Sequence, residues 1–167
     1  MSKLPDAEKL CTQLARELKA RVTPASAMVG IHTGGAWVAE RLHQALKLQT
    51  PLATLDVSFY RDDYQARGLH KDVQRSDIPF EVEGRDLVLV DDVLYTGRTI
   101  RAALHEIFDY GRPASVKLAV LVDRDGRQLP IAAQYAGTQI TVGAGQSVGL
   151  KRDAGGRLSL EVRGEKR

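Results

Sequence analysis

Two adjacent carboxylates and a short loop rich in hydroxyl groups follow one strongly apolar segment of the chain. Asp91 and Asp92 come directly after residues 87–90, and the loop at residues 95–99 reads Tyr-Thr-Gly-Arg-Thr. Paired carboxylates accept hydrogen bonds from sugar hydroxyls or hold a cation such as Mg²⁺. A loop with a glycine and several backbone N–H groups at the start of a helix suits a phosphate. A phosphorylated sugar would satisfy both halves of this pattern.

The flanking residues predict the elements that position these groups. Residues 87–90 read Leu-Val-Leu-Val, which is typical of a central parallel strand covered on both faces. Apolar residues recur at helical spacing from Ile100 to Phe108, before Gly111 and Pro113, and residues 116–122 form another apolar run. In open α/β sheets, ligands bind at the carboxyl ends of the strands, which is where the two acids lie.

The rest of the chain repeats the same alternation. We predict a helix over residues 5–21 with Pro5 as its first residue, a strand over 27–31, a glycine-rich loop at 32–35 and a helix through Val38, Leu42 and Ala45. Residues 55–60 alternate like a half-buried strand, and 139–142, 148–152 and 158–162 predict short strands. The fold class is therefore α/β, an open parallel sheet with flanking helices plus small C-terminal strands, in a single domain spanning 1–167.

One long polar stretch interrupts this pattern. Residues 61–79 show little apolar periodicity, and a loop of that length in a compact domain is usually functional. We interpret it as a mobile active-site loop.

Composition restricts the class of protein. The 167 residues are 43% hydrophobic and 27% charged, as expected for one globular domain, and the net charge of +3 is compatible with an anionic ligand. No apolar run spans a bilayer and the N-terminus leads into charged residues, so we expect a cytoplasmic protein without a membrane partner. The single cysteine, Cys11, lies on an apolar helix face and is expected to be buried, and the four histidines show no zinc-site spacing.

The segment from residue 88 to residue 99 resembles the 5-phosphoribosyl 1-pyrophosphate (PRPP) motif of type I phosphoribosyltransferases. A nucleotide-binding P-loop fits poorly because G-x-x-x-x-G-K-[ST] is absent, and a receiver-type phosphoacceptor fits poorly too. The match is most similar to the PyrR family of pyrimidine-operon attenuators and uracil phosphoribosyltransferases. That narrower match is carried by residues 29–33, 59–63, 77–80, 111–113 and 118–124, with Leu129-Pro130-Ile131.

The resemblance implies a reaction and a site. Uracil would react with PRPP and Mg²⁺ to give UMP and pyrophosphate, in a homodimer or homotetramer, with Asp91, Asp92 and Arg61 as catalytic residues. Asp91 and Asp92 would also hold the metal, directly or through water, and uracil would lie beside Val122, Asp123 and Arg124. The implied PRPP-binding residues are Thr33, Gly34, Gly35, Asp91, Asp92, Val93, Leu94, Tyr95, Thr96, Gly97, Arg98 and Thr99.

The sequence departs from the family at two places. The pyrophosphate loop usually reads Thr-Arg-Gly, whereas this chain has Gly34 where the family has a charged side chain. Two alternatives are open: Gly34 lets more backbone N–H groups reach the anion, or Arg61 or Lys71 replaces the charge. Basic residues of the family's RNA-binding face are also missing: Asp125 begins the segment that is usually Gly-His-Arg, and Ala132 stands where arginine is common. Fewer phosphate contacts weaken RNA binding, so RNA attenuation is the second hypothesis and a UMP or PRPP sensor without turnover is the third.

Overall fold

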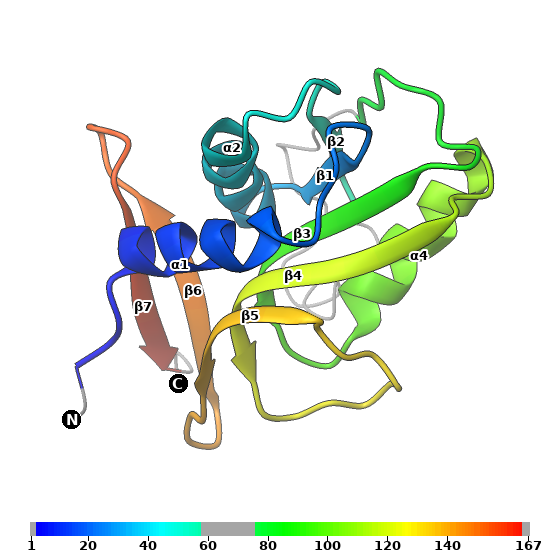
Figure 1. Cartoon of the computed structure of the whole chain (residues 1–167). Helices are drawn as coiled ribbons and strands as arrows, with labels where there is room; N and C mark the ends of the chain where they lie inside the picture. Colours follow the sequence, from blue (N-terminus) through cyan, green and yellow to red (C-terminus); the bar gives the residue numbers. More distant parts are fainter. Residues whose placement is uncertain (1–2, 58–75, 165–167) are drawn as a thin grey trace.

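A computed structural model describes residues 3–57 and 76–164 of the chain. Five parallel strands form the main sheet in the order β2-β1-β3-β4-β5, and a separate antiparallel hairpin consists of β6 and β7 (Figure 1). The elements are α1 (Ala7–Lys19), β1 (Ala27–Ile31), α2 (Gly34–Leu46), β2 (Ala53–Leu55), β3 (Asp86–Leu94), α4 (Arg98–Tyr110), β4 (Ser115–Arg124), β5 (Tyr135–Ile140), β6 (Gln146–Arg152) and β7 (Leu158–Gly164). Within this part of the chain, no helix is long and apolar enough to cross a membrane.

Helices cover both faces of the sheet, which explains why its central strands are apolar throughout. Successive residues of a strand point to opposite faces. Val88 and Val90 of β3 pack in one core with α1 and α2, whereas Leu87 and Leu89 pack in a second core with α4. The predicted α/β fold with a parallel sheet is confirmed.

Several predicted boundaries differ from the observed ones. The strand expected at 139–142 begins at Tyr135 instead and joins the main sheet beside β4, because Gln134 bonds to Leu118 at its start. The strand expected from residue 55 runs over Ala53–Leu55, where it pairs with β1. Its predicted continuation beyond residue 57 lies outside the described residues.

Helix α1 begins later than the sequence predicts. Pro5 precedes the helix, because Asp6 is the N-cap and its carboxylate accepts a hydrogen bond of 3.1 Å from the Lys9 N–H. Cys11 is 4% exposed within the core, as predicted. Burial chiefly, and the charge of Glu8 next, raise the pKa of the Cys11 thiol to about 11.

The β6–β7 hairpin is attached to the helices that cover one face of the sheet. Val148, Leu150 and Leu158 are buried in the same core as α1 and α2. Glu8 of α1 accepts hydrogen bonds from Arg41 of α2, at 3.2 and 3.3 Å, and from the Leu158 N–H at 2.9 Å. The hairpin is thereby held beside the carboxyl ends of the central strands (Figure 1).

Candidate functional site

The two acids lie near the carboxyl end of β3, the strand that pairs with β4. Asp91 and Asp92 are part of β3, which continues to Leu94 alongside β4 after its pairing with β1 ends at Val90. Asp91 is 3% exposed and its Oδ1 accepts a hydrogen bond of 2.9 Å from the Asp92 N–H. Asp92 Oδ1 in turn accepts one of 2.8 Å from the Val93 N–H. Their own backbone therefore fixes the orientation of both carboxylates.

The loop after β3 forms a recess at the start of α4. Gly97 has φ 95° as the N-cap residue, a conformation that glycine adopts without strain. Thr96 is buried and its Oγ1 accepts a hydrogen bond of 3.2 Å from the Arg98 N–H. The recess measures about 30 Å³ and is bordered by Asp91, Val93, Leu94, Tyr95, Thr96, Gly97, Thr99 and Ile100. One carboxylate of the acidic pair thus borders the predicted phosphate loop.

Residues 123–131 contact the loop at residues 95–99 through hydrogen bonds and one cation–π contact. The Gln128 N–H donates to the Thr96 carbonyl at 2.9 Å, and Arg98 Nε donates to Gln128 Oε1 at 3.1 Å. The Arg124 guanidinium lies 3.8 Å from the centre of the Tyr95 ring. Arg127 donates to the Tyr95 carbonyl and, at 2.6 Å, to Asp123 Oδ1. These contacts fix the loop before any ligand arrives.

The second half of the predicted glycine-rich loop at 32–35 belongs to helix α2. Thr33 is the N-cap of α2, and Gly34 and Gly35 form its first turn. A Cβ atom at Gly35 would lie 2.8 Å from the Val90 carbonyl oxygen, and one at Gly34 would lie 2.1 Å from Asp92 Oδ2. Gly35 therefore allows the amino end of α2 to approach the backbone of β3, whereas a side chain at residue 34 would displace the Asp92 carboxylate.

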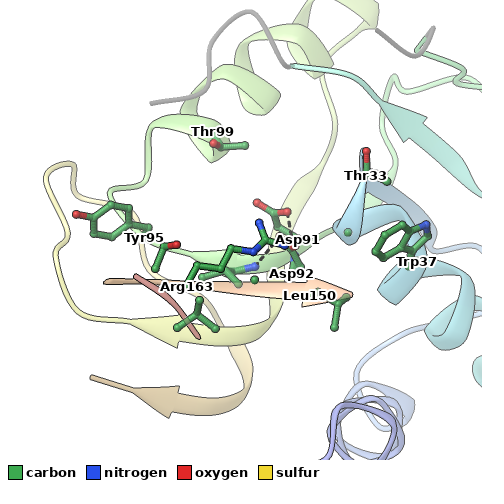
Figure 2. A pocket seen from close by; sticks show the side chains of 13 residues that line it. Thr33, Trp37, Asp91, Asp92, Tyr95, Thr99, Leu150 and Arg163 are labelled. Carbon is green, nitrogen blue, oxygen red and sulfur yellow. Dashed lines mark hydrogen bonds between the residues drawn. The ribbon is translucent and has the colours of Figure 1, made fainter. Parts of the chain in front are cut away.

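These elements enclose one pocket of about 560 Å³ (Figure 2). Its lining combines the acids, the amino end of α2, the loop after β3 and one side of the β6–β7 hairpin. The residues are Thr33, Gly34, Trp37, Asp91, Asp92, Val93, Tyr95, Thr99, Ser147, Val148, Gly149, Leu150 and Arg163. Among these described residues, two are anionic and one, Arg163, is cationic. The structure thus brings together the acids, Thr33, Gly34, Tyr95 and Thr99 around one pocket, and their contact with PRPP stays a prediction.

Sequence reasoning missed the hairpin residues of the pocket. Alternating apolar residues predicted the strands at 148–152 and 158–162, but no local pattern indicates that residues 147–150 face the acids. Trp37 packs on the core and also lines the pocket, and the Arg152 guanidinium lies 4.7 Å from its ring centre.

The residues predicted to bind uracil lie outside the pocket, next to the loop at residues 95–99. Val122 is fully buried, Asp123 is paired with Arg127, and Arg124 is 9% exposed and lies against Tyr95. None of the three is among the described residues that line the pocket, so their contact with uracil stays a prediction.

The predicted mobile loop at 61–79 is described only from residue 76 onward. Arg61, Lys71 and the rest of the stretch up to residue 75 lie outside the described residues. At its other end, Asp77 exchanges backbone hydrogen bonds of 2.9 and 2.8 Å with Thr54 of β2.

Asp91 and Asp92 could provide two ligands of a metal ion whose other ligands are water or phosphate oxygens. Within residues 3–57 and 76–164, no group of three or more histidine, cysteine or acidic side chains could hold a metal ion. Two adjacent carboxylates are enough for Mg²⁺, which commonly binds one or two carboxylates together with water and substrate phosphates. The donor set at Asp91 and Asp92 therefore fits Mg²⁺ that arrives with a phosphorylated ligand.

Known proteins resemble this chain in sequence and in fold. The phosphoribosyl transferase domain family matches residues 2–153. A bifunctional protein PyrR of Pseudomonas fluorescens is 49% identical over 162 residues, covering 95% of this chain and 96% of that protein. The bifunctional protein PyrR of Pseudomonas paraeruginosa is 52% identical over 151 residues, covering 88% and 89%. A hypoxanthine phosphoribosyltransferase structure from Staphylococcus aureus, 22% identical, superimposes with a TM-score of 0.64 over 81% of this chain and 73% of that chain.

Proposed function

The chain belongs to the phosphoribosyltransferase family and, within it, to the PyrR type, and from this premise we propose that it transfers the phosphoribosyl group of PRPP to uracil. The products are UMP and pyrophosphate. Uracil is the acceptor that the resemblance to the PyrR family implies.

One observation carries the proposal. A single pocket contains two carboxylates, the hydroxyl of Thr99 beside the loop that opens α4, and the amino end of α2. A ribose ring with a phosphate at one end and a diphosphate at the other presents hydroxyl donors between two anionic groups. Such a ligand matches carboxylates that lie between two helix amino ends, where backbone N–H groups attract anions.

The reaction follows from how these groups hold the donor. Asp91 and Asp92 accept hydrogen bonds from the ribose hydroxyls, the loop at residues 95–99 binds the 5′-phosphate, and Thr33, Gly34 and Gly35 bind the diphosphate. Positive charge develops on the ribose ring as the bond to pyrophosphate breaks, and the nearby carboxylates stabilise it. Fixing the donor and the base in line removes most of the orientational cost of the reaction.

The two carboxylates would hold Mg²⁺. Asp91 and Asp92 would bind the ion directly or through water, and the bound ion would supply positive charge that offsets the negative charge of the diphosphate. Because both carboxylates would otherwise repel PRPP, we expect binding of the donor to require the cation.

The decisive assay is pyrophosphate release from PRPP and Mg²⁺ with one base at a time. We expect release with uracil and much less with cytosine, hypoxanthine or orotate. Release with hypoxanthine but not uracil would contradict the choice of base, and no release with any base would contradict the enzyme.

A matched pair of variants on β3 tests the site. Asp92→Asn should lower turnover about ten- to a hundredfold, the range expected for loss of a charged hydrogen-bond acceptor. Asp86→Asn is the control, because Asp86 lies at the other end of β3 and accepts a hydrogen bond of 2.6 Å from Ser115. Equal turnover of the two variants, with both folded, would argue against the site.

RNA binding is a second candidate function. The relatives named above are called bifunctional, and Arg16, Lys19 and Arg21 are exposed at the end of α1. Titration of a structured pyrimidine-operon leader RNA over a salt series, against an unrelated hairpin, tests this role. A shallow salt dependence without discrimination between the two RNAs would eliminate it.

A further inference from the structure

Among the described residues that line the pocket, basic side chains are scarce for a ligand that carries a diphosphate. Its described lining contains Asp91 and Asp92 but only one basic side chain, Arg163 of β7. The amino end of α2, where the family resemblance leads one to expect an arginine, has Gly34 instead. A diphosphate carries several negative charges, and two carboxylates in the same pocket repel it.

The hairpin has a slot for the Arg163 guanidinium. A Cβ atom at Gly149 on β6 would lie 3.1 Å from Arg163 Cζ and 3.2 Å from its Nη2, so any larger residue at 149 would displace the guanidinium. Glu161 forms an ion pair with the same guanidinium. The absence of a side chain at 149 and the carboxylate at 161 together determine where the positive charge lies.

Glu161 does not neutralise this part of the hairpin. Lys151 Nζ lies 2.8 Å from the second oxygen of the Glu161 carboxylate, so two cations share one anion. Hydrogen bonds from Lys151 and then Arg163 lower the pKa of Glu161. The three side chains therefore leave one net positive charge at the edge of the pocket.

Arg163 lies toward the side of the pocket that contains the acids. Figure 2 shows its side chain extending from β7 toward Asp91 and Asp92, and Thr33 and Gly34 line the same space. In register, Arg163 pairs with Ser147, which also lines the pocket. The guanidinium thus approaches the space in front of the acids from the opposite wall.

We propose that Arg163 is a substrate-binding residue that contacts the diphosphate of PRPP and supplies from the hairpin the charge that residue 34 lacks. This inference rests on the proposed function. A guanidinium binds two phosphate oxygens with two parallel hydrogen bonds, whereas a neutral base carbonyl offers one acceptor. The anion-attracting amino end of α2 lines the same pocket, which favours the diphosphate over the base as the partner.

Binding of inorganic pyrophosphate with Mg²⁺, measured by calorimetry, tests the contact without turnover. Arg163→Gln should weaken this binding about tenfold or more, as expected for loss of a charge-assisted hydrogen bond. Arg163→Lys should retain part of the affinity, because it keeps the charge and loses the bidentate geometry. Arg157→Gln is the matched control: this arginine of the same hairpin is paired with Asp6 at 3.1 Å and does not line the pocket.

Steady-state kinetics separate the diphosphate from the base. Arg163→Gln should raise KM for PRPP and leave KM for uracil unchanged. Unchanged pyrophosphate binding in this folded variant, a rise confined to KM for uracil, or a wild-type protein that does not bind pyrophosphate would each overturn the inference. If the wild type binds pyrophosphate through Arg163 but releases none from PRPP with any base, the inference stands and the proposed function fails.

Discussion

The two glycines at the start of α2 should respond differently to the same added methyl group. At Gly35, a Cβ atom would lie 2.8 Å from the Val90 carbonyl oxygen and 2.9 Å from Asp91 Cα, both backbone atoms of the central strand. At Gly34, it would meet Oδ2 and Cγ of Asp92, at 2.1 and 2.7 Å. The first contact involves the backbone of the sheet, and the second involves a side chain that can rotate.

The magnitudes follow from these contacts. Gly35→Ala must push the first turn of α2 from β3 by roughly half an ångström, and overpacking of this kind costs about 1–3 kcal/mol. Alanine's higher helix propensity offsets up to about 1 kcal/mol of that cost. A net loss of about 1–2 kcal/mol lowers Tm by about 2–8 °C in a chain of this size. Gly34→Ala forfeits the hydrogen bond between Asp92 and the Val93 N–H, worth about 1 kcal/mol, and alanine's propensity offsets most of it.

Thermal unfolding and pyrophosphate release should therefore separate the two variants. Gly35→Ala should unfold earlier than wild type. Gly34→Ala should keep a Tm close to that of wild type and lose turnover, because Asp92 is displaced from its position beside α2. Gly155→Ala is the control, since its Cβ atom would meet a single atom, at 3.4 Å. An unchanged Tm for Gly35→Ala, or full turnover for Gly34→Ala, would refute the reasoning.

Two further predictions concern the support of the site. Burial would raise the pKa of Glu8, but hydrogen bonds from Arg41 and the Leu158 N–H, with the charges of Arg41 and Arg157, lower it below 4.5. A carboxyl group whose pKa is lowered by folding stabilises the fold at pH values above its unfolded pKa, and this stabilisation is lost as pH falls through the folded pKa. Tm of Glu8→Gln should therefore be lower than that of wild type at neutral pH and approach it in acid. A difference in Tm that stays constant with pH would contradict the role given to the contacts of Glu8 with Arg41 and Leu158. Cys11, with a pKa of about 11, should react with a thiol reagent at mildly alkaline pH only after denaturation, and rapid labelling of the folded protein would argue against its burial.

The PRPP motif and the main elements could be predicted from the sequence because their information is local. The continuous apolar run at residues 87–90 requires burial on both faces, and the acids follow it directly along the chain. Alternation at 148–152 and 158–162 likewise predicts two strands. Boundaries such as the start of β5 at Tyr135 were less predictable, because pairing with β4 determines them.

Only the tertiary structure shows which distant residues share the pocket. The sequence marks Gly34 as a departure from the family, but the contact that a side chain there would make with Asp92 depends on how α2 packs on β3. Gly149 and Arg163 carry no local signal, because antiparallel pairing and attachment to α1 and α2 bring them to the acids. Periodicity along a chain specifies which face of an element is apolar. It does not specify which other element will pack against either face.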